Sequence, residues 1–259
     1  MKSPNTARIE VRPSARPVTN RSAQTDGRLL RKRPLMRKYE AAHLTPSGAG
    51  HSEITSSLQV APALPCFEDA VSALAHGSLV GTEAGPVAIE DLMPGTRVFT
   101  EEAGLQPLLW VGSTMLVPGA NGQRPEMTRL TRISADAFGP GRPMPDLMLG
   151  AGARVLSKGR SVAAAELADG VQVVRVAPVT PVRLYHVLLP RHARLRVNGL
   201  PVESYHPGTL TENSLPRELL ELLLGLFPGM NALSDFGPQA YPRAEPDLPE
   251  HRDDAEDAA

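Results

Sequence analysis

Short apolar segments separated by turns dominate the chain between residues 78 and 204. Gly and Pro occur in nearly every gap between these segments. The segments are SLVGT, VAIEDL, RVFT, PLLWVGSTMLV, LTRISADAF, DLMLG, ARVLS, VQVVRVAP, VRLYHVLL and RLRVNGLPVES, and only VAAAELADG between them has a helical pattern. Short apolar runs bounded by turn residues are typical of strands. The pattern therefore predicts a mainly β domain of many short strands.

Two further elements are predicted before these strands. In residues 37–65, RKYEAAHL and SEITSSLQVA flank the turn-rich TPSGAG, which predicts a β-hairpin. The next segment, FEDAVSALAHG, has acidic residues in its first turn and places Phe67, Val71 and Leu74 at helical spacing before Gly77. These signals predict a short helix. We take this helix as the leading element of one β-domain that spans residues 66–208.

The pattern changes again in residues 209–243, where LPRELLELLLGLF predicts an apolar helix. We expect this helix to span Ser214–Phe227, with Ser214 as the N-cap and Pro216 in the first turn. Its apolar side chains form one stripe of Leu215, Leu219, Leu222, Leu223 and Leu226 and a second stripe of Leu220, Leu224 and Phe227. So short and apolar a helix must be covered by packing. We expect the β-domain to cover the first stripe. Either the predicted helix around Phe67, which we favour, or the same helix of a second copy would cover the second.

Charge is concentrated at the two ends of the chain. Residues 1–40 hold eleven Lys and Arg against three acidic residues, and residues 244–259 hold seven acidic residues against one Arg. We expect residues 1–36 to form a basic disordered arm and residues 244–259 an acidic disordered tail. The net charge of −1 argues against a surface that coats nucleic acid, and the arm has no aromatic residues to stack on bases. We therefore expect no specific nucleic-acid partner.

The single cysteine, Cys66, excludes an intramolecular disulfide and a thiolate metal cluster. The histidines show no paired spacing for a metal site, and no phosphate-loop motif is present, so we expect neither a metal nor a cofactor. No apolar run follows the first lysine as in a secretory signal, and the longest apolar stretch, LLELLLGLF, is too short to span a bilayer. The sequence thus predicts a cytoplasmic protein without a membrane span.

Three stretches occur in an order that carries a family resemblance. They are ALAHGSLV at 73–80 followed by GPVAIEDLMPGTRVFT at 85–100, then FGPGRPMPDLMLGAGARVLS at 138–157, and finally VRLYHVLLPRHARLRVNGLPVESYHPG at 182–208. They are similar to the opening, middle and closing motifs of bacterial Hint domains, the β-fold that inteins and hedgehog autoprocessing domains share. The three stretches cover roughly half of the chain. The resemblance implies a Hint-like fold, with the hairpin before it and the apolar helix after it as additions.

The resemblance also implies a self-cleaving site, and this sequence departs from it at the decisive positions. A Hint domain places a Cys or hydroxyl nucleophile at its first residue, and that position is Ala73 here. The Ser-x-x-His that would polarise the scissile amide falls on Gly150 and Ala153. The penultimate His and terminal Asn of splicing domains fall on Glu203 and Ser204. Activating a nucleophile requires these groups, so the chain resembles a catalytically degenerate member.

Three residual candidates remain. His192 matches the late His of the family, and His186 follows the strand Tyr as in bacterial relatives. Each has an alternative interpretation as a half-buried strand histidine that bonds to the backbone. Cys66-Phe67 mimics the opening pair of the family, and a helix N-terminus would lower the pKa of its thiol. Cys66 lies seven residues too early for that role, however, so a free structural thiol is the competing interpretation.

The sequence supports a Hint-like domain that has lost self-cleavage and acts as a structural or protein-interaction module. Its partner would be a protein or an extended peptide bound at a sheet edge. One alternative is residual autoproteolysis through Cys66 or a hydroxyl. A second alternative is a β-domain that forms oligomers through the Ser214–Phe227 helix.

Overall fold

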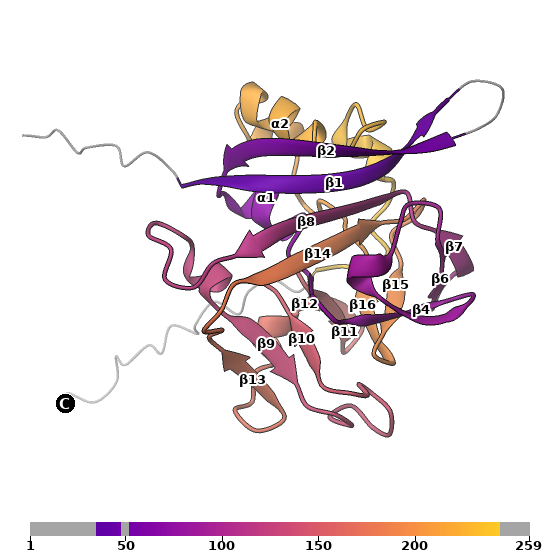
Figure 1. Cartoon of the computed structure of the whole chain (residues 1–259), viewed down its shortest axis with the longest axis vertical. Coiled ribbons are helices and arrows are strands. Elements are labelled where there is room, and N and C mark those ends of the chain that lie inside the picture. The colour runs from indigo at the N-terminus through magenta and orange to yellow at the C-terminus, as the bar shows by residue number, and fades with distance from the viewer. Residues whose placement is uncertain (1–34, 48–51, 244–259) are drawn as a thin grey trace, which may run out of the picture. The chain divides into compact units, whose positions relative to one another are not determined.

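The computed structural model describes residues 35–47 and 52–243 (Figure 1). The predicted basic arm lies outside the described residues except for its last two positions, and the predicted acidic tail lies entirely outside them. The described part is mainly β, as the sequence predicted. Among the described residues, no helix is long and apolar enough to cross a membrane.

Two eight-stranded sheets form the framework, and the named strands pair only in antiparallel fashion. The first sheet has the order β13 (Val173–Val176), β9 (Leu130–Ile133), β10 (Leu147–Leu149), β3 (Leu74–Ala75), β14 (Val182–Leu188), β8 (Trp110–Leu116), β1 (Met36–Pro46) and β2 (Ser52–Pro62). The second has the order β12 (Arg160–Ala163), β11 (Arg154–Ser157), β16 (Leu200–Glu203), β15 (Arg194–Val197), β4 (Leu79–Thr82), β6 (Arg97–Thr100) and β7 (Gly104–Pro107), with β5 (Gly85–Ala88) paired to β4. Short strands punctuated by Gly and Pro therefore do build the predicted β-domain.

The predicted hairpin is confirmed as strands β1 and β2. They pair in one continuous register from Met36 opposite Pro62 to Pro46 opposite Ser52. β1 also pairs with β8, with Glu40 opposite Ser113. The hairpin is therefore an extension of the first sheet, and β2 is its outer strand (Figure 1).

The predicted leading helix is much shorter than expected. Helix α1 spans only Pro65–Asp69, and Leu74, which we had assigned to its apolar face, lies in strand β3. The backbone N–H of Ala73 donates to the carbonyl of Tyr185 at 2.9 Å. The backbone of Leu74 pairs with strands β14 and β10. This tertiary pairing overrides the helical spacing of the apolar residues.

The C-terminal helix is also shorter than the Ser214–Phe227 prediction. Helix α2 spans Arg217–Leu224 with Pro216 as its N-cap. Ser214 lies instead in a 3-10 turn, η4 (Glu212–Ser214), where its hydroxyl accepts a hydrogen bond from the N–H of Thr211 at 2.9 Å. Because this serine caps η4, it does not cap α2.

Four other 3-10 turns connect the strands: η1 (Ile89–Asp91), η2 (Pro125–Thr128), η3 (Ala164–Leu167) and η5 (Leu233–Phe236). The VAAAELADG segment, which we interpreted as helical, forms only strand β12 and η3. The Asn-Gly turn lies between β15 and β16, with positive φ at both residues. The side chain of Asn198 ties this turn to two neighbours. It accepts from the N–H of Leu79 at 2.7 Å and donates to the carbonyl of Asp146 at 3.1 Å.

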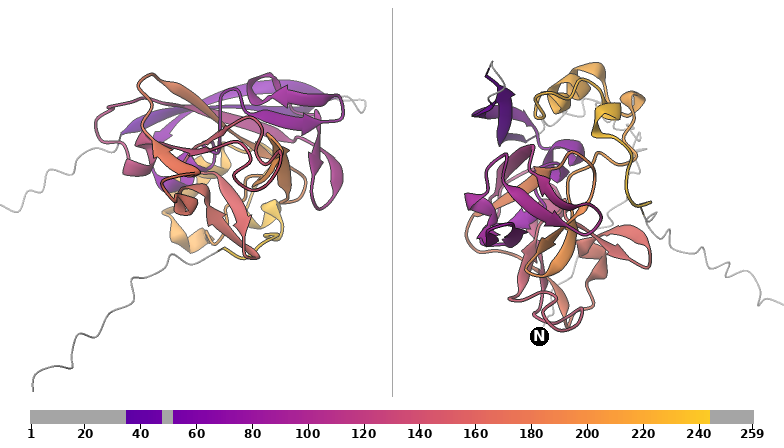
Figure 2. Two further views of the ribbon diagram at one scale, coloured as in Figure 1. Left: turned by 90° about the horizontal axis from the view of Figure 1, so that it is seen from below. Right: turned by 90° about the vertical axis from the view of Figure 1, so that its right-hand side faces the viewer.

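A hydrophobic cluster joins the hairpin, α1, β8 and the C-terminal segment. Phe227 stacks on Tyr205 with ring centroids 4.8 Å apart, and it lies 4.6 Å from the Trp110 ring. The indole N–H of Trp110 donates to the carbonyl of Leu226 at 2.6 Å. Phe67 of α1 belongs to the same cluster, and Figure 2 shows α2 beside the hairpin at the same end of the molecule.

The predicted division of the C-terminal leucines into two stripes is wrong. Leu223, Leu226 and Phe227 are buried, and they come from both stripes, while the other apolar residues of the segment are only partly buried. The contact with α1 lies within one chain, because Phe67 and Phe227 share the cluster. The shorter α2 changes which side chains face inward.

Candidate functional site

The segments that carry the family motifs converge at one place between the two sheets. The chain around Ala73 approaches the 150–153 turn, which connects β10 to β11. On the other side, the N–H of Tyr205 donates to the carbonyl of Val187 at 2.8 Å, which fixes the end of β16 beside β14. The structure thus brings together positions that the sequence separates by more than a hundred residues.

The first half of the site is formed by backbone and small side chains. The N–H of Gly150 donates to the carbonyl of Ala73 at 2.8 Å, and the N–H of Ala153 donates to the carbonyl of Gly150 at 3.2 Å. The side chains of Ala73 and Ala153 are fully buried. Neither of these side chains offers a polar atom. The residues that we assigned to the nucleophile and to the polarising His, Ala73 and Ala153, therefore lie close together but carry only methyl groups.

Gly150 is held at this position by a close backbone approach. A Cβ built on it would lie 2.2 Å from the carbonyl oxygen of Ser72. The neighbouring N–H of Gly152 donates to both the carbonyl and the hydroxyl of Ser72, at 3.0 and 3.1 Å. A side chain at residue 150 would need this backbone to move, so the present backbone has no room for the serine of the family motif.

The second half of the site is polar and buried. Nε2 of His192 lies 3.4 Å from Oε2 of Glu203, a separation that falls outside hydrogen-bond geometry. Glu203 accepts a hydrogen bond from the Ser161 hydroxyl at 2.9 Å, and Ser161 accepts one from Nε of Arg154 at 2.8 Å. A chain of contacts thus runs from Arg154 through Ser161 to Glu203. Glu203 and Ser204 are the residues that we assigned to the penultimate His and the Asn of splicing domains.

Ser204 is engaged in the β15–β16 hairpin. Its hydroxyl accepts a hydrogen bond from the N–H of Ala193 at 3.2 Å, and its own N–H donates to the carbonyl of Ala193 at 2.8 Å. The side chain is buried. This geometry assigns the hydroxyl to holding the hairpin end.

His186 lies in β14 and is buried more deeply than the half-buried position expected from the sequence. Its Nδ1 accepts from the N–H of Val187 at 3.1 Å, and its ring meets Tyr205 edge to face at 5.6 Å. Burial lowers the pKa of His186 from 6.5 to about 3, with smaller contributions in the same direction from His192 and Arg243. The ring is therefore neutral at physiological pH.

A C-terminal strap, residues 237–243, crosses the polar half of the site. The N–H of Ala240 donates to Nδ1 of His192 at 3.0 Å, which leaves the ring proton on Nε2. Nε2 of His206 donates to the carbonyl of Gly237 at 3.0 Å. The strap is fixed at its end by the guanidinium of Arg243, which donates to the carbonyl of His206 at 2.7 Å. The strap therefore engages the late histidine of the family pattern through its backbone.

His206 has no free ring nitrogen, because its Nδ1 accepts from the N–H of Gly208 at 2.9 Å. Burial lowers the pKa of this ring as well. Arg243 packs over Gly208, where a Cβ would lie 2.0 Å from the guanidinium carbon. Burial also lowers the pKa of the Arg243 guanidinium, with the nearby charge of Arg154 acting in the same direction. Sequence reasoning found no metal-site spacing for His206 and missed its role in holding the strap.

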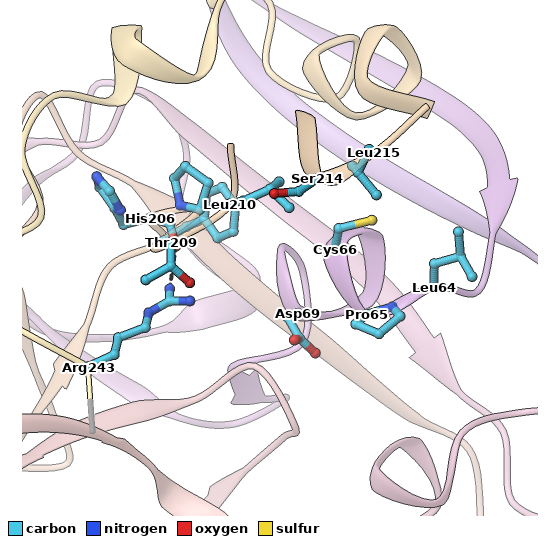
Figure 3. Close-up of a pocket in the computed structure, with 12 residues that line it drawn as sticks. Leu64, Pro65, Cys66, Asp69, His206, Thr209, Leu210, Ser214, Leu215 and Arg243 are labelled. Atoms are coloured by element: carbon cyan, nitrogen blue, oxygen red, sulfur yellow. Dashed lines mark hydrogen bonds between the residues drawn. The ribbon is translucent and has the colours of Figure 1, made fainter. Parts of the chain in front are cut away.

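Two adjoining cavities open at the site. The inner one has a volume of about 50 Å³ and is bordered by Glu203, Ser204 and His186. The outer one has a volume of about 450 Å³ and is bordered by Cys66, Leu210 and other residues (Figure 3). The inner cavity is large enough for a water molecule but too small for a substrate peptide.

Cys66 borders the outer cavity and not the inner one. His206 and Arg243 lie at the opposite end of the outer cavity from Cys66 (Figure 3). Burial raises the pKa of the Cys66 thiol, which corrects our expectation that the helix N-terminus would lower it. Two N–H groups of α1 do lower it, but α1 has only five residues and their effect is smaller than that of burial.

The arrangement is therefore suited to holding backbone in place. Within residues 35–47 and 52–243, no three His, Cys, Asp or Glu side chains converge as metal ligands.

Three members of the polar half, Arg154, Ser161 and Arg243, were not singled out by sequence reasoning. Arg154 and Ser161 flank a predicted strand turn, and no local pattern marked them. Arg243 lies in a segment without periodicity, so only the tertiary structure reveals it.

Comparisons with known proteins agree with the converging motifs. The sequence profile of a family described as the Hint domain matches residues 72–209, which is more than half of the chain. Among solved structures, a bacterial intein-like domain from Clostridium thermocellum is 14% identical, with a TM-score of 0.38 over 52% of this chain and 99% of that domain. The MchDnaB-1 intein is 16% identical, with a TM-score of 0.36 over 51% of this chain and 100% of the intein. A search of curated proteins found no match.

Proposed function

This chain belongs to the Hint domain family, and we propose that its domain has lost self-cleavage and acts as a structural or protein-interaction module. The observation that carries the proposal is the first half of the site. Ala73 occupies the nucleophile position with its methyl group buried, and it is bonded through its backbone to Gly150 and Tyr185. An N–O or N–S acyl shift cannot begin without an oxygen or sulfur at this position.

The neighbouring hydroxyl groups support the same conclusion. Ser72 precedes Ala73, but its hydroxyl accepts the N–H of Gly152. Ser204 accepts the N–H of Ala193. A working nucleophile needs a base that takes its proton, and among the described residues neither hydroxyl donates a hydrogen bond to a side-chain base.

The alternative nucleophile, Cys66, has neither of the features that would activate it. Burial raises the pKa of its thiol, so the thiolate fraction at neutral pH is lower than for a free cysteine. His206, the histidine that shares its cavity, has both ring nitrogens bonded to backbone groups. Residual autoproteolysis through Cys66 is therefore the weaker function.

The C-terminal strap favours a structural role. It covers the late His192 and fixes it by a backbone N–H. In a self-cleaving domain this region has to release the chain that follows. Here the strap, residues 237–243, follows the domain and packs against it like a further strand. The N–H of Ser161 donates to the carbonyl of Pro242 at 2.9 Å.

An oligomer anchored by the C-terminal helix has less support, because Leu223, Leu226 and Phe227 are already buried within the same chain. A protein partner or an extended peptide remains the class of partner that we propose. Sheet edges bind such segments through main-chain hydrogen bonds.

The test of lost cleavage is the intact mass of the purified full-length chain over several days. We expect a single unchanged mass in buffer, in dithiothreitol and in hydroxylamine, because no thioester or ester forms for these reagents to trap. A fragment that ends between residues 65 and 73 would contradict the proposal. A matched Cys66→Ala variant then identifies whether the Cys66 thiol produced it.

A further inference from the structure

Strand β2 leaves a long sheet edge without a partner among the described residues. It pairs with β1 along 11 residues, and no other described strand pairs with it. Edge strands are usually short, or they carry lysines, bulges or interior prolines that prevent pairing with another chain. The sequence of β2 is SEITSSLQVAP, in which Glu53 is the only charged residue and the proline is the last. This edge therefore lacks the usual protection.

The backbone groups that point outward can be assigned from the hydrogen bonds. The N–H of Ala63 donates to the carbonyl of Leu35 at 2.7 Å, one step beyond the β1–β2 register. Hydrogen-bonded pairs recur at every second residue of an antiparallel ladder. The odd-numbered residues of β2 therefore direct their N–H and C=O groups toward β1. The outward groups belong to Ile54, Ser56, Leu58 and Val60.

The side chains of these outward residues form an apolar row on one face. Ile54, Leu58 and Val60 are 46%, 59% and 49% exposed. The row continues into a groove of about 400 Å³ between the sheet and the η1 turn, where Met93 is another exposed apolar residue. Exposed apolar residues that adjoin one another on a surface are typical of an interaction site.

The opposite face of β2 is already in use. The Gln59 side chain donates to the carbonyl of Leu222 in α2 at 2.6 Å. This bond and the continuous pairing with β1 hold the strand in an extended conformation before any partner arrives. Such preorganisation lowers the entropy cost of adding a strand.

We propose that β2 pairs with β2 of a second copy of this chain, in antiparallel orientation about a twofold axis at Ser57. The two first sheets then form one continuous sheet. This inference concerns a surface outside the Hint motifs, and it does not depend on whether the domain cleaves itself.

The self-complementary sequence of β2 is the reason to choose a second copy as the partner. With the axis at Ser57, Ile54 lies opposite Val60 of the partner copy and Ser56 lies opposite Leu58. All four outward residues then form hydrogen-bonded pairs, in which Ile54 meets the apolar Val60 and Leu58 meets Ser56. No pair in this register places two charges together, because Glu53 lies opposite Ala61.

The two glutamates are also far apart. Glu53 of each copy is separated from that of the other by eight strand positions, or about 27 Å at the usual rise per residue. This exceeds the Debye length at physiological ionic strength, so the repulsion is largely screened. A charged peptide would find only Glu53 as a charge along this edge. A second copy would bring no like charge close to Glu53.

The first experiment compares oligomeric state by sedimentation velocity and light scattering over a wide range of concentrations. We expect the full-length chain to approach twice its monomer mass as its concentration rises. Lysine at both Ile54 and Leu58 should weaken this association at least about tenfold, because charged edge residues oppose strand addition. The melting temperature measured at concentrations where the parent chain is monomeric should not fall, because both side chains then face solvent. A matched control places lysine at Phe138 and Val171, which are also exposed.

The second experiment tests the register by cross-linking in a Cys66→Ser background. Ser57→Cys should form an intermolecular disulfide, because residues at the axis form a non-hydrogen-bonded pair whose Cα separation suits a disulfide. Thr55→Cys should not, because it faces Gln59 of the partner copy. A chain that stays monomeric at every concentration overturns the proposal, and so does a dimer unaffected by the two lysines. A monomer that binds an added extended peptide along β2 also overturns it and identifies a peptide as the partner. A disulfide at Thr55 alone overturns the register.

Discussion

The two halves of the Hint site have departed from the family pattern in different ways. The half around Ala73, Gly150 and Ala153 has small residues whose backbones are in direct contact. The half around His192 and Glu203 remains polar, but its groups are buried and bonded to each other or to the C-terminal strap. In the first half, polar side-chain atoms are therefore missing at residues 73, 150 and 153. In the second half polar side-chain atoms are present, and most of them are bonded within the chain.

This difference shows that the two halves place different demands on their side chains. The backbone bonds that join residues 73, 150 and 185 require only that the strands pair, and alanine or glycine meets that requirement. The polar half is more demanding, because a buried carboxylate needs donors around it. Ser161 supplies one donor to Glu203, and Oε1 of Glu203 has no partner among the described residues.

The largest effect is expected in the small-residue half, at Gly150. Gly150→Ala should lower the free energy of unfolding by about 3 kcal/mol, because the added Cβ meets the backbone oxygen of Ser72 at 2.2 Å. Gly81→Ala is the matched control, since its Cβ would have no neighbour closer than 3.6 Å. Urea denaturation followed by circular dichroism measures both variants. Equal stability of the two would show that residues 72 and 150 can separate easily, and the contrast between the halves would then fail.

The elements that the sequence predicted well are those specified by local residues. The hairpin follows from two β-rich runs around a turn-rich loop. The mainly β character of the domain follows from short apolar runs bounded by Gly and Pro. The assignment of Ala73 and Ala153 to the catalytic positions of the family motifs stays a prediction, and so does the loss of cleavage.

The elements that the sequence predicted poorly are those decided by distant contacts. Phe67, Val71 and Leu74 have helical spacing, yet Leu74 pairs with Leu149 and Tyr185. The strap over His192 begins 45 positions later in the chain, and its residues show no periodicity. A local pattern contains no information on either contact, so the fold was predictable at the level of strands but the polar half of the site was not.

The next effect sharpens the contrast through pH. The buried His186 ring has a pKa of about 3 in the folded chain against 6.5 when exposed. Below pH 6.5 the unfolded chain therefore binds a proton that the folded chain does not, and the folded state loses stability as the pH falls toward 3. This histidine should cost about 2 kcal/mol of stability between pH 7.5 and 5.

His186→Gln should flatten that part of the pH profile, which denaturant titrations at the two pH values would measure. His76→Gln is a control, because His76 is 62% exposed. If the His186→Gln variant keeps the full pH dependence of the parent chain, the ring is not held neutral by burial. The polar half would then be more open to water than the structure indicates.

The smallest effect is expected at the outer end of the strap, where its contacts lie near the surface. The Tyr241 hydroxyl donates to Glu102, and the guanidinium of Arg194 lies 4.9 Å from the centre of the Tyr241 ring. Exposed contacts of these kinds contribute little, so Tyr241→Ala should lower the free energy of global unfolding by less than about 1 kcal/mol.

The effect of Tyr241→Ala on local opening of the strap should be clearer. The N–H of Ala240 is held only by His192, and the N–H of Ser161 only by the carbonyl of Pro242. When the strap loosens, both amides lose these acceptors together, and their exchange with deuterated solvent should accelerate by the same factor. The amide of Ala73, bonded to Tyr185 in the other half, should exchange as before. Hydrogen exchange followed by mass spectrometry distinguishes these amides, and Val179→Ala serves as a control at an exposed loop position. Faster exchange at Ala73 as well would mean that the two halves open as one unit, whereas unchanged exchange at Ala240 would mean that the inner contacts hold the strap without Tyr241.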